Sequence, residues 1–156
     1  MENFPDKKKL INNLLAGLGA CLCISSLAYL NFSEYGDIWL IPPFGASMVL
    51  VMAVHESPLA QPKNIILGHI LSALSGVVIY SFMGATFISI GIAVGLAVFV
   101  MASLNIIHPP AGANPIIVIL GGKGLSFILM PVALGAVFIV LFSIAYNRLI
   151  MKRNYP

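Results

Sequence analysis

The sequence predicts an all-α integral membrane protein, and its composition, its hydropathy and the length of its apolar runs lead to this fold class. Of the 156 residues, 60% are hydrophobic and 8% are charged, whereas soluble domains average roughly 25% charged residues. The mean hydropathy is +1.02. Since a chain of this size cannot hide so many apolar side chains in one core, lipid is its expected solvent.

Basic residues gather at the two ends of the chain, whose net charge is +3. Lysines occupy positions 7–9, and three more basic residues lie between positions 148 and 153. Basic residues that flank membrane spans favour the cytoplasmic side, so both termini are expected there. This distribution is a topology signal, and no nucleic-acid partner is expected. The opening residues do not resemble an organelle transit peptide, so a bacterial inner membrane is the expected location.

Four apolar segments are long enough to be spanning helices. The first, Leu10–Leu30, is interpreted as a retained helix and not as a signal peptide, because it has the length of a span and no clean cleavage site follows it. The other three are expected at residues 64–83, 86–107 and 125–147, the last with Pro131 in its first turns.

Two further apolar segments are interrupted by proline and glycine. Ile38–Val54 carries Pro42, Pro43 and Gly45 near its start, so it is not one regular helix throughout. Residues 108–115 are followed by only a short apolar stretch before a glycine-rich turn. If both segments are re-entrant, the chain has four spans and parallel halves; if both cross, it has six spans and inverted halves. The brevity of the second segment favours short re-entrant helices.

The two interrupted segments are related by an internal repeat. Residues 42–47 and 109–114 align without a gap at a spacing of 67 residues, and they match at both prolines, the glycine and the alanine that follows it. Each hexamer follows one expected helix and precedes another, which indicates a duplicated unit. We therefore expect a single transmembrane domain over residues 1–156, with repeat halves at about 10–82 and 83–150.

Ser47 and Asn114 occupy the same position in the two repeats, just before an apolar stretch, where a helix N-cap is expected. Two short helices would then begin inside the membrane, with backbone N–H groups that lipid cannot satisfy. Water, a neighbouring carbonyl or an anion can meet them, and Gly45 and Gly112 would let a small ligand approach the backbone. The alternative is that these residues only kink and close-pack helices.

Other polar residues lie near or within the expected spans. His108, at the end of a span, is a candidate gate or anion contact, or an interfacial histidine that bonds a carbonyl. Asn105 precedes it by three residues on the same expected helix face, and His69 lies within another span. These two side chains line a path or form interhelical hydrogen bonds. Lys63, at a helix start, either recruits anions or extends to the membrane interface.

The string His-Pro-Pro-Ala-Gly-Ala-Asn-Pro at residues 108–115 resembles the signature of the HPP family of small integral membrane proteins. The segments 41–47 and 57–64, and Pro131 with Gly135, also resemble that family's pattern. The family is usually described as having four transmembrane helices, and its plastid and cyanobacterial members are associated with nitrite transport. The family's motif positions present here are Pro42, Pro43, Gly45, Gln61, His108, Pro109, Pro110, Gly112 and Asn114.

The expected function is that of a membrane transporter or channel for a small monovalent anion, and the resemblance implies nitrite. Four spans hardly enclose a pore alone, so a homo-oligomer is expected. No enzyme, cofactor or metal is expected, because the apolar spans hold no carboxylate and the sequence shows no metal-ligand spacing or phosphate loop. The alternative is a structural or regulatory membrane subunit. The candidate substrate-binding or pore-lining residues are Pro43, Gly45, Ser47, Gln61, Lys63, His69, Asn105, His108, Pro109, Pro110, Gly112 and Asn114.

Overall fold

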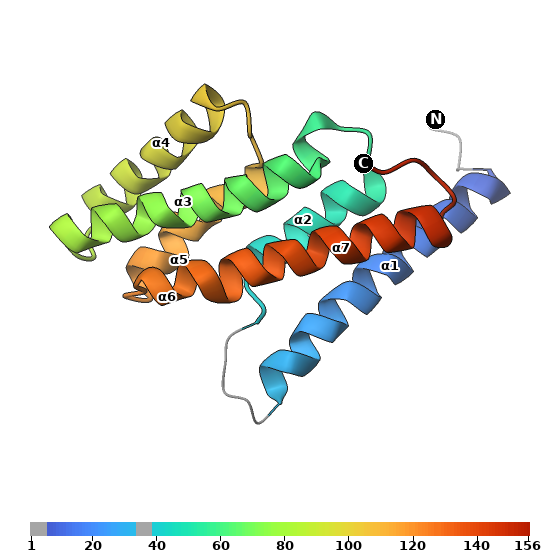
Figure 1. The fold of residues 1–156 in the computed structure, drawn as a ribbon, viewed down its shortest axis with the longest axis horizontal. Coiled ribbons are helices and arrows are strands. Elements are labelled where there is room, and N and C mark those ends of the chain that lie inside the picture. Colours follow the sequence, from blue (N-terminus) through green and yellow to red (C-terminus); the bar gives the residue numbers. More distant parts are fainter. Residues whose placement is uncertain (1–5, 34–38) are drawn as a thin grey trace.

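The computed structural model describes residues 6–33 and 39–156, and the regular structure in these ranges is helical (Figure 1). Three helices are long and apolar enough to cross a membrane: α1 (Lys7–Phe32), α3 (Pro62–Met83) and the stretch Leu125–Leu149. The last comprises α6 (Leu125–Phe127), the π-helical turn η3 (Ile128–Ala133) and α7 (Leu134–Leu149). The prediction of an all-α membrane protein is confirmed.

The expected span at residues 86–107 forms a shorter helix, α4 (Phe87–Ser103), of 17 residues. It ends early because Asn105 adopts a left-handed backbone conformation, with φ 53°, which asparagine tolerates and which stops a helix. The expectation that Asn105 and His108 share one helix face was therefore wrong. His108 lies beyond the helix in an extended conformation, as a residue that precedes proline prefers.

Both proline pairs begin helices and do not kink them. The first pair opens α2 (Pro42–Ala53), and the second opens the short helix η2 (Pro109–Ala113), which continues directly into α5 (Asn114–Leu120). Proline suits the first turn of a helix, because its φ is already helical and the N–H group that it lacks would have no partner there.

The expectation that Ser47 and Asn114 are N-caps was also wrong. Ser47 lies in the second turn of α2, whose N-cap is the apolar residue Ile41. Asn114 has helical backbone angles, with φ −60° and ψ −44°, and its side chain does not bind the start of α5. In both repeats the helix begins at the proline pair, five residues earlier, so these two polar side chains project from within a helix.

The helices run in alternating directions along the long axis of Figure 1. Helices α2 and α5 both begin near the middle of the view and run to opposite ends, and α3 and α7 are antiparallel. The C-terminal tail returns to the loop between α2 and α3, where the Tyr155 hydroxyl donates to the carbonyl of Ala60 in η1 (Pro58–Ala60) at 2.7 Å. This loop and the C-terminus therefore lie at the same end of the molecule.

The outer surface is apolar, as a lipid-facing surface should be. On α1 only 17% of the most apolar window is buried, and Leu14 and Phe32 are 72% and 88% exposed. The inner core is formed by apolar side chains of α1, α2, α3 and α7, among them Leu27, Phe44 and Ile139. Beside this core the structure buries a group of polar side chains.

Candidate functional site

Four polar side chains meet at the centre of the bundle: Ser47 of α2, His69 of α3, His108 just before η2, and Asn114 at the start of α5. Each of these residues is 0% exposed. All four were candidate site residues in the sequence, and they come from segments as far as 67 positions apart. We call this group the polar centre.

The Ser47 hydroxyl lies between the two histidines of the polar centre. Its oxygen is 2.9 Å from Nε2 of His69 and 2.7 Å from Nε2 of His108. The carbonyl oxygen of Pro43, in the preceding turn of α2, is a third neighbour at 3.2 Å. The centroids of the two imidazole rings are 5.0 Å apart. A single hydroxyl therefore connects the two rings.

The outer nitrogens of the two histidines fix the direction of the hydrogen bonds. Nδ1 of His108 is 2.8 Å from the carbonyl oxygen of Leu59, so it donates, and Nε2 of the neutral ring accepts. The Asn114 amide nitrogen is 2.9 Å from the backbone carbonyl of His69 and 3.0 Å from Nδ1 of the same residue, so it donates to both. Nδ1 of His69 then accepts, and its Nε2 donates to Ser47.

The polar centre is thus a one-way chain of hydrogen bonds. Asn114 donates to His69, His69 to Ser47, Ser47 to His108, and His108 to the carbonyl of Leu59. When both histidines are neutral, every N–H and O–H hydrogen of these four side chains is used in a hydrogen bond. What remains is one acceptor, the Asn114 side-chain oxygen, which is buried and has no partner among the described residues. An unsatisfied buried polar atom costs about 1–3 kcal/mol.

Neighbouring residues hold the centre in place. The Ser72 hydroxyl of α3 donates to the carbonyl of Ala111 in η2 at 2.5 Å. The ring of Phe44 packs edge-on against His69, with centroids 5.3 Å apart. A Cβ atom at Gly68 would lie 2.9 Å from Cβ of His108, so only glycine lets α3 approach His108 this closely. We did not single out these residues from the sequence, although Gly68 stands directly beside a candidate histidine.

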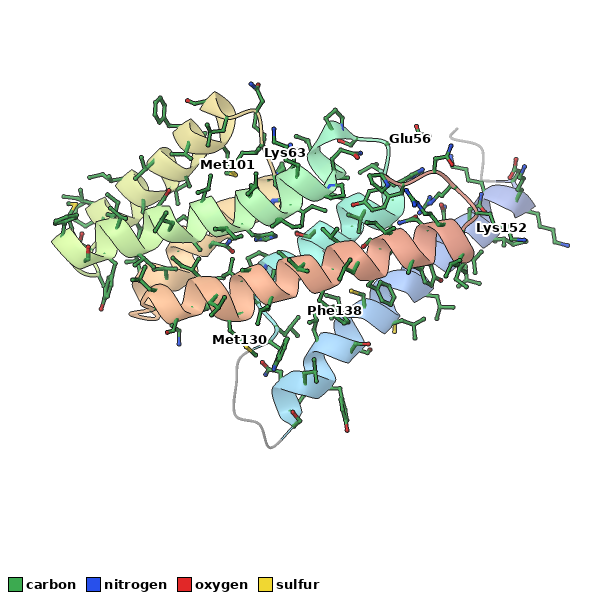
Figure 2. All side chains as sticks on the ribbon, viewed as in Figure 1. Glu56, Lys63, Met101, Met130, Phe138 and Lys152 are labelled. Carbon is green, nitrogen blue, oxygen red and sulfur yellow. The ribbon has the colours of Figure 1, made fainter. Side chains whose placement is uncertain are left out.

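Three candidate residues lie away from the polar centre. Gln61 donates to the backbone carbonyls of His55 and Ser57, both at 3.2 Å, and so ties the loop before α3. Lys63 is exposed on the first turn of α3 (Figure 2), and Asn105 is exposed after α4. The structure does not bring these side chains to the centre.

The remaining candidates act through the backbone. Pro43 is buried and supplies the carbonyl near Ser47, whereas Pro109 and Pro110 start η2. A Cβ atom at Gly45 or Gly112 would meet nothing within 4 Å, so neither glycine is required by close packing. Gly45 borders an open pocket of about 370 Å³ whose lining also includes Ile24, Leu40, Ile41 and Pro42.

In the described part of the chain no group of three or more His, Cys, Asp or Glu side chains is placed to hold a metal ion.

The C-terminal tail anchors the loop that contains Leu59, whose carbonyl is the last acceptor in the series of hydrogen bonds. Arg153 donates to the carbonyl of Met52, at the end of α2, and to the side-chain oxygen of Asn147 at 2.7 Å. Tyr155 is 1% exposed, and burial raises the pKa of its hydroxyl to about 12. Its bond to the carbonyl of Ala60 fixes η1, which contains Leu59, and thereby supports His108.

Comparison with known proteins gives a family match and two similar proteins. The family model described as "HPP, transmembrane region" matches residues 5–156. A transmembrane protein of Dictyostelium discoideum is 34% identical over 160 residues, which covers 97% of this chain and 56% of that protein. A second one is 36% identical over 143 residues, which covers 86% of this chain and 46% of its own length. The chain therefore spans about half the length of these curated relatives. No solved structure matches it.

Proposed function

We propose, from the premise that this chain belongs to the HPP transmembrane family, that it is a transporter or channel for a small monovalent anion, with nitrite the first solute to test. The observation that carries the proposal is the buried polar centre. Polar side chains at membrane depth are costly and usually line the path of a solute. The side-chain oxygen of Asn114 has no partner among the described residues, so the centre retains unused hydrogen-bonding capacity.

Electrostatics support an anion over a cation. Ser47 and Asn114 lie within the first two turns of α2 and of the helix Pro109–Leu120, so the positive ends of both helix dipoles are close to the centre. No Asp or Glu residue lies on α2, α3, α4, η2, α5 or α7. A cation would therefore find no negative side chain on these helices.

We also propose that the chain is an inverted duplication whose two broken segments cross the membrane. The contact between Tyr155 and Ala60 supports this arrangement, because it places the loop between α2 and α3 on the same side as the C-terminus. The re-entrant alternative would put that loop on the opposite side. Helix α2, with 12 residues, spans about 18 Å of a core of ~30 Å, so a crossing also requires part of the chain that precedes Pro42.

The location and assembly of the protein are part of the proposal. In Figure 1 the start of α1 and the end of α7 lie at the same end of the molecule, and both carry basic residues. We therefore place both termini in the cytoplasm, with a bacterial inner membrane as the expected setting. A homo-oligomer is expected, because so few spanning helices hardly enclose a path for a solute.

The test is uptake into proteoliposomes of nitrite, compared with nitrate, formate and chloride, after subtraction of uptake into protein-free vesicles. We expect saturable nitrite uptake that falls at least tenfold in Asn114→Leu, because the leucine removes the amide that orients His69. The matched control is Ser143→Ala, which changes a fully buried residue of α7 outside the centre and should leave uptake unchanged. Folded wild-type protein that moves none of the four anions would contradict the proposal and favour a structural or regulatory subunit.

A further inference from the structure

We infer that the polar centre takes up one proton with each anion, through the hydrogen-bonded pair of histidines joined by Ser47, so that the solute crosses as a neutral unit. The inference rests on the proposed function and adds the coupling ion to it. It rests on two observations: the centre has no free hydrogen-bond donor in its neutral form, and the surrounding helices carry no negative side chain.

The four side chains of the neutral polar centre offer an anion no free hydrogen-bond donor. Asn114 donates its two hydrogens to the backbone oxygen and Nδ1 of His69, and each remaining N–H or O–H in the chain already has an acceptor. The one free atom, the side-chain oxygen of Asn114, is itself an acceptor. The oxygens of a nitrite-like anion only accept hydrogen bonds, so this oxygen repels them.

One added proton can be carried without breaking the chain, because Ser47 has a second acceptor. When Nε2 of His108 is protonated it donates to the Ser47 oxygen, and the serine hydrogen turns to the carbonyl of Pro43 at 3.2 Å. The resulting imidazolium keeps its other bond, from Nδ1 to the carbonyl of Leu59 at 2.8 Å. The geometry thus provides hydrogen-bond partners for both the neutral and the singly protonated forms of the centre.

The chain can also pass the proton from one histidine to the other. A proton that binds Nδ1 of His69 forms an N–H bond there, and the Nε2–H bond of the same ring breaks as its proton moves to the Ser47 oxygen. The original serine proton moves to Nε2 of His108, which becomes the imidazolium while His69 returns to neutral. Atoms and charge balance, and no other reactant is needed.

Asn114 makes anion binding depend on this proton. When Nδ1 of His69 is protonated it donates, so the amide of Asn114 must turn and present its oxygen to that nitrogen. The turn places the amide N–H groups where the unpaired oxygen had been. The turn also brings the amide oxygen against the backbone oxygen of His69, from which the nitrogen had been 2.9 Å away, so the charge-assisted bond from His69 must outweigh that contact. The site then offers donors to an anion only in its protonated form.

The surroundings require the proton and the anion to enter together. The segments α2, η1, η2 and α5 contain no titratable side chain. Besides His69, α3 adds exposed Lys63 and half-buried Tyr80, and α7 adds Tyr146 and Arg148. A buried imidazolium therefore has no carboxylate partner on these elements, and an unpaired buried charge is strongly disfavoured. The transported anion is the counterion that makes protonation possible.

The experiment measures nitrite uptake and internal pH together in proteoliposomes that contain a pH-sensitive dye, with the membrane potential set by potassium and valinomycin. We expect one proton to enter with each nitrite, no response of the rate to membrane potential, and a rise of about tenfold for each unit decrease of external pH below saturation. Nitrite uptake that follows the membrane potential and leaves the internal pH constant would overturn the inference, although the proposed function would stand. Absence of any anion uptake would refute the proposed function itself.

Ser47 provides the variant test of the proton link. In Ser47→Ala the rings lose the hydroxyl that joins them. We expect the uptake rate to fall at least tenfold and its pH dependence to disappear. Ser47→Thr retains the hydroxyl and should restore the pH dependence, whereas a merely structural role would change the rate without changing its slope against pH. Ser143→Ala is the control. Unaltered proton coupling in Ser47→Ala would also overturn the inference.

Discussion

Asn114 binds two atoms of the same histidine, and this bidentate contact fixes which nitrogen of His69 carries the hydrogen. The tautomer of His108 is fixed in the same manner by the carbonyl of Leu59. Each ring is therefore oriented by a partner outside the pair, and Ser47 needs only to join them. Orientation by outer partners is how proteins commonly set the hydrogen-bonding role of a functional histidine.

Gly68 gives a test of how tightly this arrangement is packed. In Gly68→Ala the new methyl group would lie 2.9 Å from Cβ of His108 and 3.3 Å from the backbone oxygen of Ile106, so one of the segments must move. We expect a loss of about 1–3 kcal/mol in the free energy of unfolding and a loss of nitrite uptake. Thermal unfolding in detergent measures the first and proteoliposomes the second.

The control for this prediction is Gly95→Ala on α4. This glycine is also helical, but a Cβ atom there would meet nothing within 4 Å. The variant should be as stable as wild type or slightly more so, since alanine favours a helix over glycine. A stable Gly68→Ala protein with normal uptake would show that His108 does not depend on this close approach.

The sequence singled out the polar residues that meet inside the bundle, but it misplaced two of them within their helices. Ser47, His69, His108 and Asn114 stood out because polar side chains are rare in apolar spans, and the structure brings all four together. The expected N-caps were wrong, because a proline pair at the start of a helix competes with a polar residue further along as the signal for its first turn. The contact between His69 and Ser47 joins two helices, and contacts between such distant segments cannot be predicted from a single sequence.

At the scale of elements, the tail and the η1 turn act as one support. The hydroxyl of Tyr155 and the side chain of Arg153 bind backbone carbonyls of η1 and of the end of α2, which are otherwise unpaired ends of helices. From the sequence we interpreted the basic tail as a topology signal only. Its packing role depends on a tyrosine that is buried although it stands next to the chain end.

Tyr155→Phe removes the hydrogen bond to Ala60 and should lower the free energy of unfolding by about 0.5–1.5 kcal/mol near neutral pH. Burial raises the pKa of Tyr155 from 10.0 to about 12, so the stabilising contribution is complete below pH 10 and is lost as the pH rises toward 12. The stability of the wild type should therefore fall to that of the variant, and then below it, over this interval, because a pKa shift of this size outweighs the contribution of the hydrogen bond. Tyr29→Phe, at an exposed position on α1, is the matched control.

At the scale of the whole molecule, one end gathers the basic tail, the start of α1 and the loop between α2 and α3. Figure 2 shows Glu56 and Lys152 toward this end, and the turn between α3 and α4 lies at the other. From the sequence alone, the brevity of the second broken segment favoured four parallel spans over six inverted ones, and the terminal charges could not decide, because both counts are even and leave both termini on one side. The tail contact supports our proposal of the inverted arrangement, since it joins segments that this arrangement alone places on the same side.

Labelling of single cysteines tests this topology directly. In a background with Cys21 and Cys23 replaced by alanine, we introduce Glu56→Cys, Ala85→Cys or Lys152→Cys and treat oriented vesicles with a membrane-impermeant maleimide. The inverted six-crossing arrangement predicts that positions 56 and 152 react from one side and position 85 from the other. Re-entrant segments with parallel halves predict that positions 85 and 152 react together and position 56 reacts alone. That second pattern would refute the inverted duplication, and it would also mean that the contact between Tyr155 and Ala60 does not form in the membrane.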